Sequence, residues 1–270
     1  MGVRTPSYQA GFYAPERGGL AAYPQLWRGC VGAWNPGLGP SGLVLREWSG
    51  RKNHGTLTNM DADTGFGVSG GQMALRFDGT NKHVDVGSSN AVNSIVGSLT
   101  ATAWFRFTAI DGQRWAIANV DSSFSVDHGF QLGTNAGKFA MYVFNGVFPG
   151  VESTTDIVAN RLYHVAGTAS ASGMALYVDG NLVASNSNAA ASVASPRKLI
   201  FGARERGGLS AASANGIIAE VRVYNRVLSA GEIRLLARRP GIAYELAPRK
   251  VYSLASPSSA RLRRILTGAT

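Results

Sequence analysis

Acidic residues near the end of the chain are the first candidates for chemistry. Hydrolysis of a glycosidic bond needs two carboxyl groups that flank the bond, one of which acts as an acid. The stretch IIAEVRVY, residues 217–224, offers one carboxylate, Glu220, and the next charged side chain is Arg222. Because the second carboxylate is missing, we predict no glycosidase activity.

Other catalytic patterns are also missing from the sequence. There is no phosphate-binding loop and no Cys/His spacing typical of a metal site. Of the four histidines, His164 lies within a predicted strand, and His128 follows Asp127 as an isolated pair in a predicted loop. We therefore predict that the protein is not an enzyme and has no catalytic residues.

The composition indicates a large domain that is held together by packing. The chain has 270 residues, of which 45% are hydrophobic and 34 are glycine. Cys30 is the single cysteine, so no intrachain disulfide can form. The first residues lack the apolar core of a secretory signal, and no apolar run is long enough to span a membrane.

Short apolar runs separated by Gly, Asn, Asp and Ser predict an all-β fold. In LTATAWFRFT, residues 99–108, alternate side chains from Leu99 to Phe107 share one face. The stretch GMALYVDGNLVAS is a predicted hairpin with its turn at Asp179-Gly180. After the strand 217–224, Ser229 and Glu232 have the spacing of a helix capping box. Single sheets of this kind leave a face uncovered, so two sheets must stack.

The two ends of the chain have a different character from this body. Residues 1–29 are predicted to be an extended arm, 30–237 the jelly-roll domain, and 238–270 a basic, apolar tail with a short helix after Ser258 or Ser259. Residues 238–270 hold seven basic side chains and one acidic side chain, Glu245, and so account for +6 of the net charge of +10. A tail that is solvated or packed on a partner is favoured over one that binds nucleic acid.

Several segments resemble a known family. ALRFDGTNKHVDVG, LTATAWFRF, RLYHVAGT, GMALYVDGNLVAS, LIFGA and IIAEVRVYNRVLSAGEI together resemble the laminin-G-like, concanavalin A-like jelly-roll superfamily. The resemblance covers about residues 30–237. It implies a two-sheet antiparallel jelly-roll sandwich with a concave and a convex face, flanked here by the N-terminal arm and the C-terminal tail.

The resemblance also bears on metals and cofactors. Many relatives bind a structural Ca²⁺, and the family pattern Ile-Asp-Glu is replaced here by Ile218, Ala219 and Glu220. Asp61 and Asp63 resemble the start of a calcium loop, but Gln72 stands where such a loop needs glutamate. Asp61 and Asp63 are thus weak candidate ligands that serve equally well as turn formers. We expect no cofactor and disfavour structural calcium.

The flanks resemble a more particular group. YPQLWRGCVGAWNPGLGPSG and RRPGIAYELAPRK are similar to the ends of jelly-roll proteins from tailed bacteriophages and environmental bacteria. This implies a non-enzymatic structural or decoration protein of a phage particle, located in the virion after assembly in the bacterial cytoplasm. Its partners would be other virion proteins and copies of itself, with no membrane contact.

The arms would provide the contacts in that role, because they are too apolar for a solvated linker. A chain trimmed to residues 28–238 would then stay folded but lose assembly. The predicted partner-binding residues are Tyr8, Phe12, Tyr13, Ile242, Tyr244, Leu246, Val251, Tyr252 and Leu254.

The alternative function is that of a lectin-like adhesion module. Sugar binding needs exposed aromatic rings beside polar groups. Trp104 and Arg106 share a face of one predicted strand, and Trp115 is near them in sequence, so these three are the candidate glycan contacts. The loop FNGVFPGV, residues 144–151, is a further candidate contact segment. The same tryptophans would suit the core or the cover of a sheet equally well.

Overall fold

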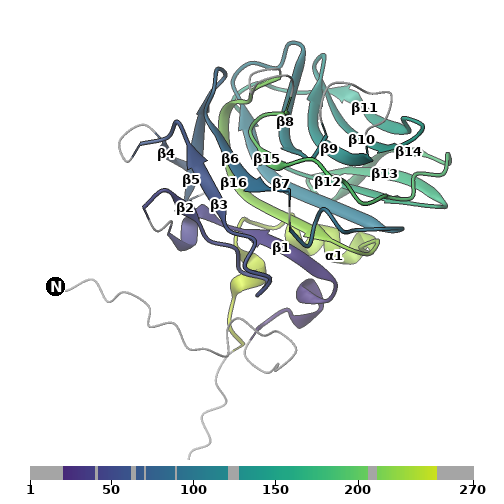
Figure 1. The fold of residues 1–270 in the computed structure, drawn as a ribbon, viewed down its shortest axis with the longest axis horizontal. Coiled ribbons are helices and arrows are strands. Elements are labelled where there is room, and N and C mark those ends of the chain that lie inside the picture. The colour runs from purple at the N-terminus through teal and green to yellow at the C-terminus, as the bar shows by residue number, and fades with distance from the viewer. Residues whose placement is uncertain are drawn as a thin grey trace, which may run out of the picture.

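The computed structural model describes residues 21–39, 42–61, 65–69, 71–88, 90–120, 128–205 and 212–247. In this part of the chain two antiparallel sheets pack face to face, as predicted (Figure 1). No helix among these residues is long and apolar enough to cross a membrane.

The first sheet, called here the β7–β16 sheet, has the central strands β7 and β16. In spatial order its strands are β14 (Asn181–Asn186), β13 (Gly173–Val178), β12 (Tyr163–Ser170), β7 (Leu99–Phe107), β16 (Asn215–Tyr224), β5 (Gln72–Asp78) and β4 (Phe66–Ser69). Strand β1 (Cys30–Trp34) also pairs with β16.

The second sheet, called the β8–β11 sheet, is also antiparallel. In spatial order its strands are β11 (Gly150–Asp156), β10 (Lys138–Asn145), β9 (His128–Asn135), β8 (Gln113–Ala118), β15 (Leu199–Phe201), β6 (His83–Gly87), β3 (Gly55–Thr58) and β2 (Val44–Leu45).

The predicted alternation of β7 is confirmed. The residues of β7 that face the second sheet belong to the main core between the two sheets: Leu99, Ala101, Ala103, Phe105 and Phe107. From β10, Phe139, Met141 and Val143 enter the same core. This shared core explains why the other residues of β10 face away from it.

Local signals also gave the correct turn and helix start. Asp179 and Gly180 have φ angles of 49° and 82°, the left-handed pair that a tight hairpin turn needs. The capping box of α1 (Ala230–Leu236) is present, because Ser229 Oγ accepts from the Glu232 amide and Glu232 accepts from the Ser229 amide.

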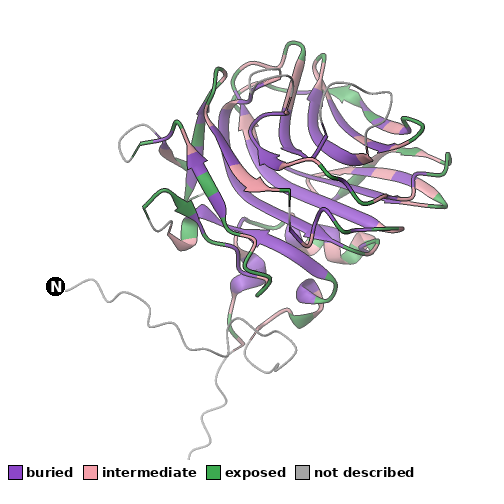
Figure 2. Ribbon diagram, viewed as in Figure 1, coloured by how far each residue is buried: buried purple, intermediate pink, exposed green. Residues whose placement is uncertain are grey.

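A third layer covers the outer face of the β7–β16 sheet. It consists of η2 (Pro24–Trp27), α1 and η4 (Ile242–Tyr244), and we call it the outer layer. Its core includes Leu26, Trp27, Ile242 and Tyr244. As a result, β1, β7 and β16 are buried along almost their whole length (Figure 2).

One buried ion pair lies beneath the outer layer. Arg222 Nε is 2.6 Å from Glu220 Oε1, and both side chains are almost inaccessible to solvent. The Arg222 guanidinium lies 4.5 Å from the ring centres of both Trp27 and Tyr244. The two rings therefore enclose the cation and tie both ends of the described chain to β16.

Candidate functional site

The outer face of the β8–β11 sheet carries a hydrogen-bonded cluster of polar side chains. On β10, Tyr142 points away from the core because Met141 and Val143 point into it. Its register partners are Gln131 on β9 and Gly150 on β11. Glu152 and Asn135 lie on the same face, and their side chains reach Tyr142.

These three side chains form a closed hydrogen-bond network. The Tyr142 hydroxyl donates to Glu152 Oε1 in a short hydrogen bond. Asn135 Nδ2 donates to the Tyr142 hydroxyl at 3.1 Å and to Glu152 Oε1 at 2.8 Å. Burial, together with the bond to the Glu152 carboxylate, raises the pKa of Tyr142 above its usual range. The phenol therefore stays neutral and remains a hydrogen-bond donor.

Gly150 and Trp115 contact the Tyr142 ring from two sides. A Cβ atom at Gly150 would lie 2.4 Å from Cδ1 of Tyr142, so the ring lies directly against the glycine backbone. Trp115 packs edge-on against Tyr142, with 5.9 Å between ring centroids and an interplanar angle of 81°. The ring is thus held from two sides, while Glu152 remains exposed.

Two further polar groups belong to this face. Gln131, opposite Tyr142, is 2% exposed, and its Oε1 has no hydrogen-bond partner among the described residues. The Trp115 indole N–H also lacks a partner and is fully buried. Buried polar atoms of this kind are rare in folded proteins, because each costs desolvation free energy.

An exposed aromatic ring lies at the end of the same face. Phe144 follows Tyr142 by two residues on β10 and so points to the same side. Phe148, in the turn to β11, packs on Phe144 at a centroid distance of 5.4 Å and is 47% exposed. Within the predicted contact loop 144–151, Phe148 and Val147 are indeed the exposed apolar residues.

The three predicted glycan contacts do not come together. Trp104 lies on the β7–β16 sheet, is 9% exposed, and donates its indole N–H to the Leu236 carbonyl of α1 at 3.2 Å. Arg106 follows it on β7, whereas Trp115 lies on the other sheet and is completely buried. Neither tryptophan offers a ring to a ligand, so their prediction as sugar platforms is wrong. Sequence reasoning missed Tyr142, Asn135 and Glu152.

The arm residues that fall in the described chain behave differently from one another. Ile242 and Tyr244 are buried in the outer layer of the same molecule, so their prediction as contacts to a partner is wrong. Leu246 is 57% exposed and forms an isolated antiparallel bridge with Ala21. The other predicted arm contacts lie outside the described residues: Tyr8, Phe12, Tyr13, Val251, Tyr252 and Leu254.

The predicted metal ligands do not form a cluster either. Asp61 is exposed, and its carbonyl accepts from the Gly65 amide at 3.0 Å, which fits a turn former. Asp63 lies outside the described residues. Ala219 is buried in a small apolar cluster with Trp104 and Ile217. Across the described ranges, no three His, Cys, Asp or Glu side chains are close enough to hold a metal ion together.

Glu220, the single carboxylate of the closing strand, is engaged in structure. Besides its pair with Arg222, its Oε2 accepts from the Gly241 amide at 2.6 Å. Both carboxylate oxygens therefore have partners within the protein, Arg222 on β16 and the Gly241 amide just before η4.

Several solved structures have a similar fold. Domain 4 of the extracellular GH43 arabinanase AbnA from Geobacillus stearothermophilus, in complex with arabinotriose, is 12% identical with a TM-score of 0.60, covering 77% of this chain and 98% of that one. The IT-sialidase CBM40 of Ruminococcus gnavus bound to α2,3-sialyllactose is 19% identical with a TM-score of 0.53, covering 61% and 96%. The binding domain of Paraclostridial Mosquitocidal Protein 1 is 17% identical with a TM-score of 0.57, covering 79% and 52%.

These identities are low, and the likenesses show the fold alone. A search of curated protein sequences gave no significant match. The family model described as the concanavalin A-like lectin/glucanases superfamily matches residues 78–234, more than half of the chain. That span runs from the end of β5 to α1 and includes most of both sheets. The chain is a member of the concanavalin A-like lectin/glucanase superfamily.

Proposed function

We propose that this protein is a non-enzymatic carbohydrate-binding module that binds glycans on the outer face of the β8–β11 sheet. The observation that carries the proposal is the network of Tyr142, Asn135 and Glu152 on the outer face of β9, β10 and β11, where Glu152 is exposed. Two of the similar structures, the arabinanase domain and CBM40, were solved with bound oligosaccharides, and this supports the same role here.

The chemistry of the face suits sugar hydroxyls. Glu152 uses Oε1 within the network, which leaves Oε2 to accept from a sugar hydroxyl. Asn135 donates through Nδ2, so its Oδ1 offers a second acceptor. The exposed ring of Phe148 offers an apolar surface for the C–H groups of a sugar.

The charge of the face favours neutral glycans. Glu152 is exposed and negative, and the basic side chain at this end of the sheet, Lys138, is paired with Asp156 at 2.5 Å. A sialylated or uronic ligand would bring a second negative charge close to Glu152, and like charges repel. We therefore expect neutral oligosaccharides to bind more tightly than acidic ones.

Titration calorimetry with arabinotriose and with sialyllactose would test the proposal. Tyr142→Ala and Glu152→Gln should each weaken binding of the neutral ligand at least tenfold. Tyr177→Phe, on the other sheet, is the matched control and should bind as the unaltered protein does. Unchanged affinity in Tyr142→Ala, or binding of sialyllactose alone, would contradict the proposed site.

Absence of catalysis is part of the same proposal. Glu152 has no second free carboxylate beside it in the described network, and a hydrolase needs two. Incubation with β-glucans and arabinans should release no reducing ends. Turnover that is lost in Glu220→Gln or Glu152→Gln would contradict this expectation.

A further inference from the structure

A polar pocket lies outside the proposed glycan site, and we call it the Arg51 pocket. It is formed by residues 51–53, which follow β2, by residues of the segment 88–94, which follows β6, and by residues 194–195, which precede β15. Its volume is about 600 Å³, within the range of sites for small molecules. The lining residues used below are Arg51, Ser88, Asn90, Asn93, Ser94 and Ser195.

Two buried asparagine side chains fix the floor of the Arg51 pocket. Asn90 Oδ1 accepts from the amides of Val92 and Asn93 at 3.0 and 3.1 Å. Its Nδ2 donates to the Gly87 carbonyl at 2.8 Å. Asn93 Nδ2 donates to the Ser195 carbonyl at 3.0 Å, which ties together two loops that are far apart in sequence. The pocket therefore has its shape before a ligand binds, and this lowers the ordering cost of binding.

Three side chains of the pocket are free to donate hydrogen bonds to a ligand. Arg51, Ser88 and Ser94 are all exposed, so their polar ends can be reached from the solvent. Within the described ranges, neither the Arg51 guanidinium nor the hydroxyls of Ser88 and Ser94 have a hydrogen-bond or ion-pair partner. A ligand that accepts from these groups would break no bond within the protein.

The charge of the pocket is positive. None of the described residues that line it is acidic. Glu47, which precedes it in the chain, is buried and accepts from the backbone amides of Ser49 and Arg51. Asp85, at the end of β6, is paired with Lys198 at 2.8 Å. No carboxylate therefore neutralises the Arg51 guanidinium, and the pocket favours an anion.

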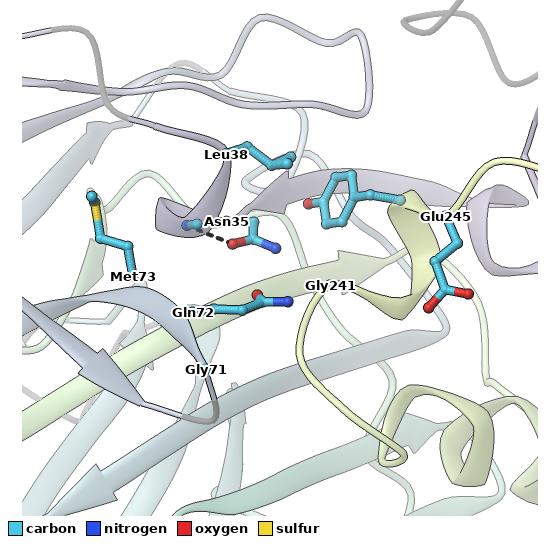
Figure 3. A pocket seen from close by; sticks show the side chains of 9 residues that line it. Asn35, Leu38, Gly71, Gln72, Met73, Gly241 and Glu245 are labelled. Carbon is cyan, nitrogen blue, oxygen red and sulfur yellow. Dashed lines mark hydrogen bonds between the residues drawn. The ribbon is translucent and has the colours of Figure 1, made fainter. Parts of the chain in front are cut away.

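The cleft between η3 (Pro36–Leu38), the turn into β5 and η4 lacks this chemistry (Figure 3). There Asn35 Oδ1 already accepts from the Gly37 amide at 2.8 Å. The remaining amide atoms, Asn35 Nδ2 and Gln72 Oε1, are buried beyond the reach of a ligand. Accessible donors thus distinguish the Arg51 pocket from that cleft.

From these groups we propose that the Arg51 pocket binds a phosphate group, either free or carried by a small polar molecule. The guanidinium supplies a planar fork of N–H donors that matches phosphate oxygens, and the hydroxyls of Ser88 and Ser94 donate to the others. Donors from three side chains suit the three terminal oxygens of a phosphomonoester. None of the described residues that line the pocket is aromatic, so the rest of the molecule is expected to be polar. The site does not depend on glycan binding at Tyr142.

The experiment is an amide chemical-shift titration of the full chain with glycerol phosphate, inorganic phosphate and glycerol, each added singly at constant ionic strength. The phosphates should shift signals of residues 51–53, 90–94 and 194–195 until saturation, and glycerol should not. Arg51→Gln should weaken phosphate binding at least tenfold without lowering the melting temperature, because the guanidinium has no partner in the described protein. Ser94→Ala should weaken binding by about threefold to tenfold, which corresponds to one hydrogen bond.

Arg46→Gln is the matched control, because Arg46 carries the same charge, is exposed and does not line the pocket. It should leave the titration unchanged. The phosphate that binds more tightly identifies the source of the group, ester or free ion, and either result supports the site.

Three results would overturn the proposal. One is the absence of a saturable shift around the pocket with both phosphates. Another is binding of glycerol as tight as that of glycerol phosphate, which would show that the phosphate group is not recognised. The third is an equal loss of affinity in Arg46→Gln and Arg51→Gln, which would show attraction to the overall positive charge of the protein.

Discussion

Both sheets are built from strands with alternating side chains, but the outward side chains of β7 and of β10–β11 differ in how far they are buried. On β7, Thr100, Thr102 and Trp104 face outward, and all three are buried by the outer layer. On β10 and β11, the outward side chains of Tyr142 and Glu152 remain partly or fully exposed. The difference arises from segments far away in sequence, residues 24–27 and 230–244, which cover the outer face of β7 but do not reach the outer face of β10 and β11.

This contrast explains where the aromatic residues of the chain are used. Trp27, Trp48 and Tyr244 form edge-to-face contacts within the outer layer, at centroid distances of 5.2 and 6.5 Å. They close a face and provide no binding platform. The outer face of β10 and the turn into β11 keeps a smaller set, Tyr142 and Phe148, beside the polar network that we propose as the glycan site.

The largest expected effect follows from removing the segments that close the β7–β16 face. A chain trimmed to residues 28–238 loses Leu26, Trp27, Ile242 and Tyr244, each buried in the outer layer. At roughly 1.5–3 kcal/mol for each buried side chain, the loss is comparable with the whole stability of a typical domain. Far-ultraviolet circular dichroism and urea unfolding should show a severely destabilised protein, contrary to the expectation from sequence.

A chain trimmed to residues 21–247 is the matched control for that truncation. It keeps η2 and η4 and should unfold at a urea concentration close to that of the full chain. Equal unfolding midpoints for the two trimmed chains would show that the outer layer adds little.

The next effect concerns the buried ion pair of the closed face. Arg222→Met leaves the Glu220 carboxylate buried without its cation, which should lower the free energy of unfolding by about 3–5 kcal/mol. Adding Glu220→Gln to Arg222→Met removes the isolated charge and should restore part of the loss. Urea unfolding measures both. A double variant less stable than Arg222→Met would contradict this account.

A pH effect should also come from the closed face. His164 is buried against Trp104, and burial lowers the pKa of its imidazole from 6.5 to about 3. Between pH 6.5 and 3, His164 binds a proton in the unfolded chain but stays neutral in the folded chain. The free energy of unfolding therefore falls as the pH drops from 6.5 toward 3. The slope from this residue is about 1.4 kcal/mol per pH unit. His164→Gln should flatten that part of the profile, measured by urea unfolding at several pH values.

The control for this titration is a histidine on the open sheet. His128, at the start of β9, is partly exposed. His128→Gln should leave the slope between pH 6.5 and 3 unchanged. An equal flattening in both variants would show that burial beneath the outer layer is not the cause.

The smallest expected effect is that of calcium. Ala219 stands in the apolar cluster of the closed face, and a methyl group there supplies no oxygen to a cation. Melting temperatures with calcium and with a chelator should agree within the few degrees that about 1 kcal/mol produces. A larger rise on adding calcium would reveal ligands elsewhere in the chain.

Much of the body of the fold could be predicted from local patterns. The alternation of residues 99–107, the Asp179-Gly180 turn and the Ser229–Glu232 capping box each depend on neighbours in sequence, and each is present. Pairing between distant strands came from the family resemblance, since periodicity carries no information on which strands meet. The sequence did not predict that Leu26 and Tyr244 pack onto the domain. Both lie in short 3-10 helices, which are too short to show a repeating pattern of apolar residues.

The candidate sites were harder to predict for a related physical reason. Trp104 and Trp115 are the same residue type on strands of similar pattern, and their burial is decided by side chains that arrive from other elements. Tyr142, Asn135 and Glu152 come from three strands and meet only through the register of β9, β10 and β11. The signal that could have indicated Tyr142 is its outward position in KFAMYVF, directly opposite Met141 and Val143.

The bridge between Ala21 and Leu246 has a consequence for how the domain can be attached to other chains. Ala22 donates its amide to the Glu245 carbonyl at 2.7 Å, so residues 21–22 and 245–246 lie side by side next to the outer layer. A domain with this geometry can be inserted into a loop of a host protein, or its ends can be joined and new ends opened in a distant turn, with little strain. Either way, the two covalent connections would be made beside each other, at the Ala21–Leu246 bridge.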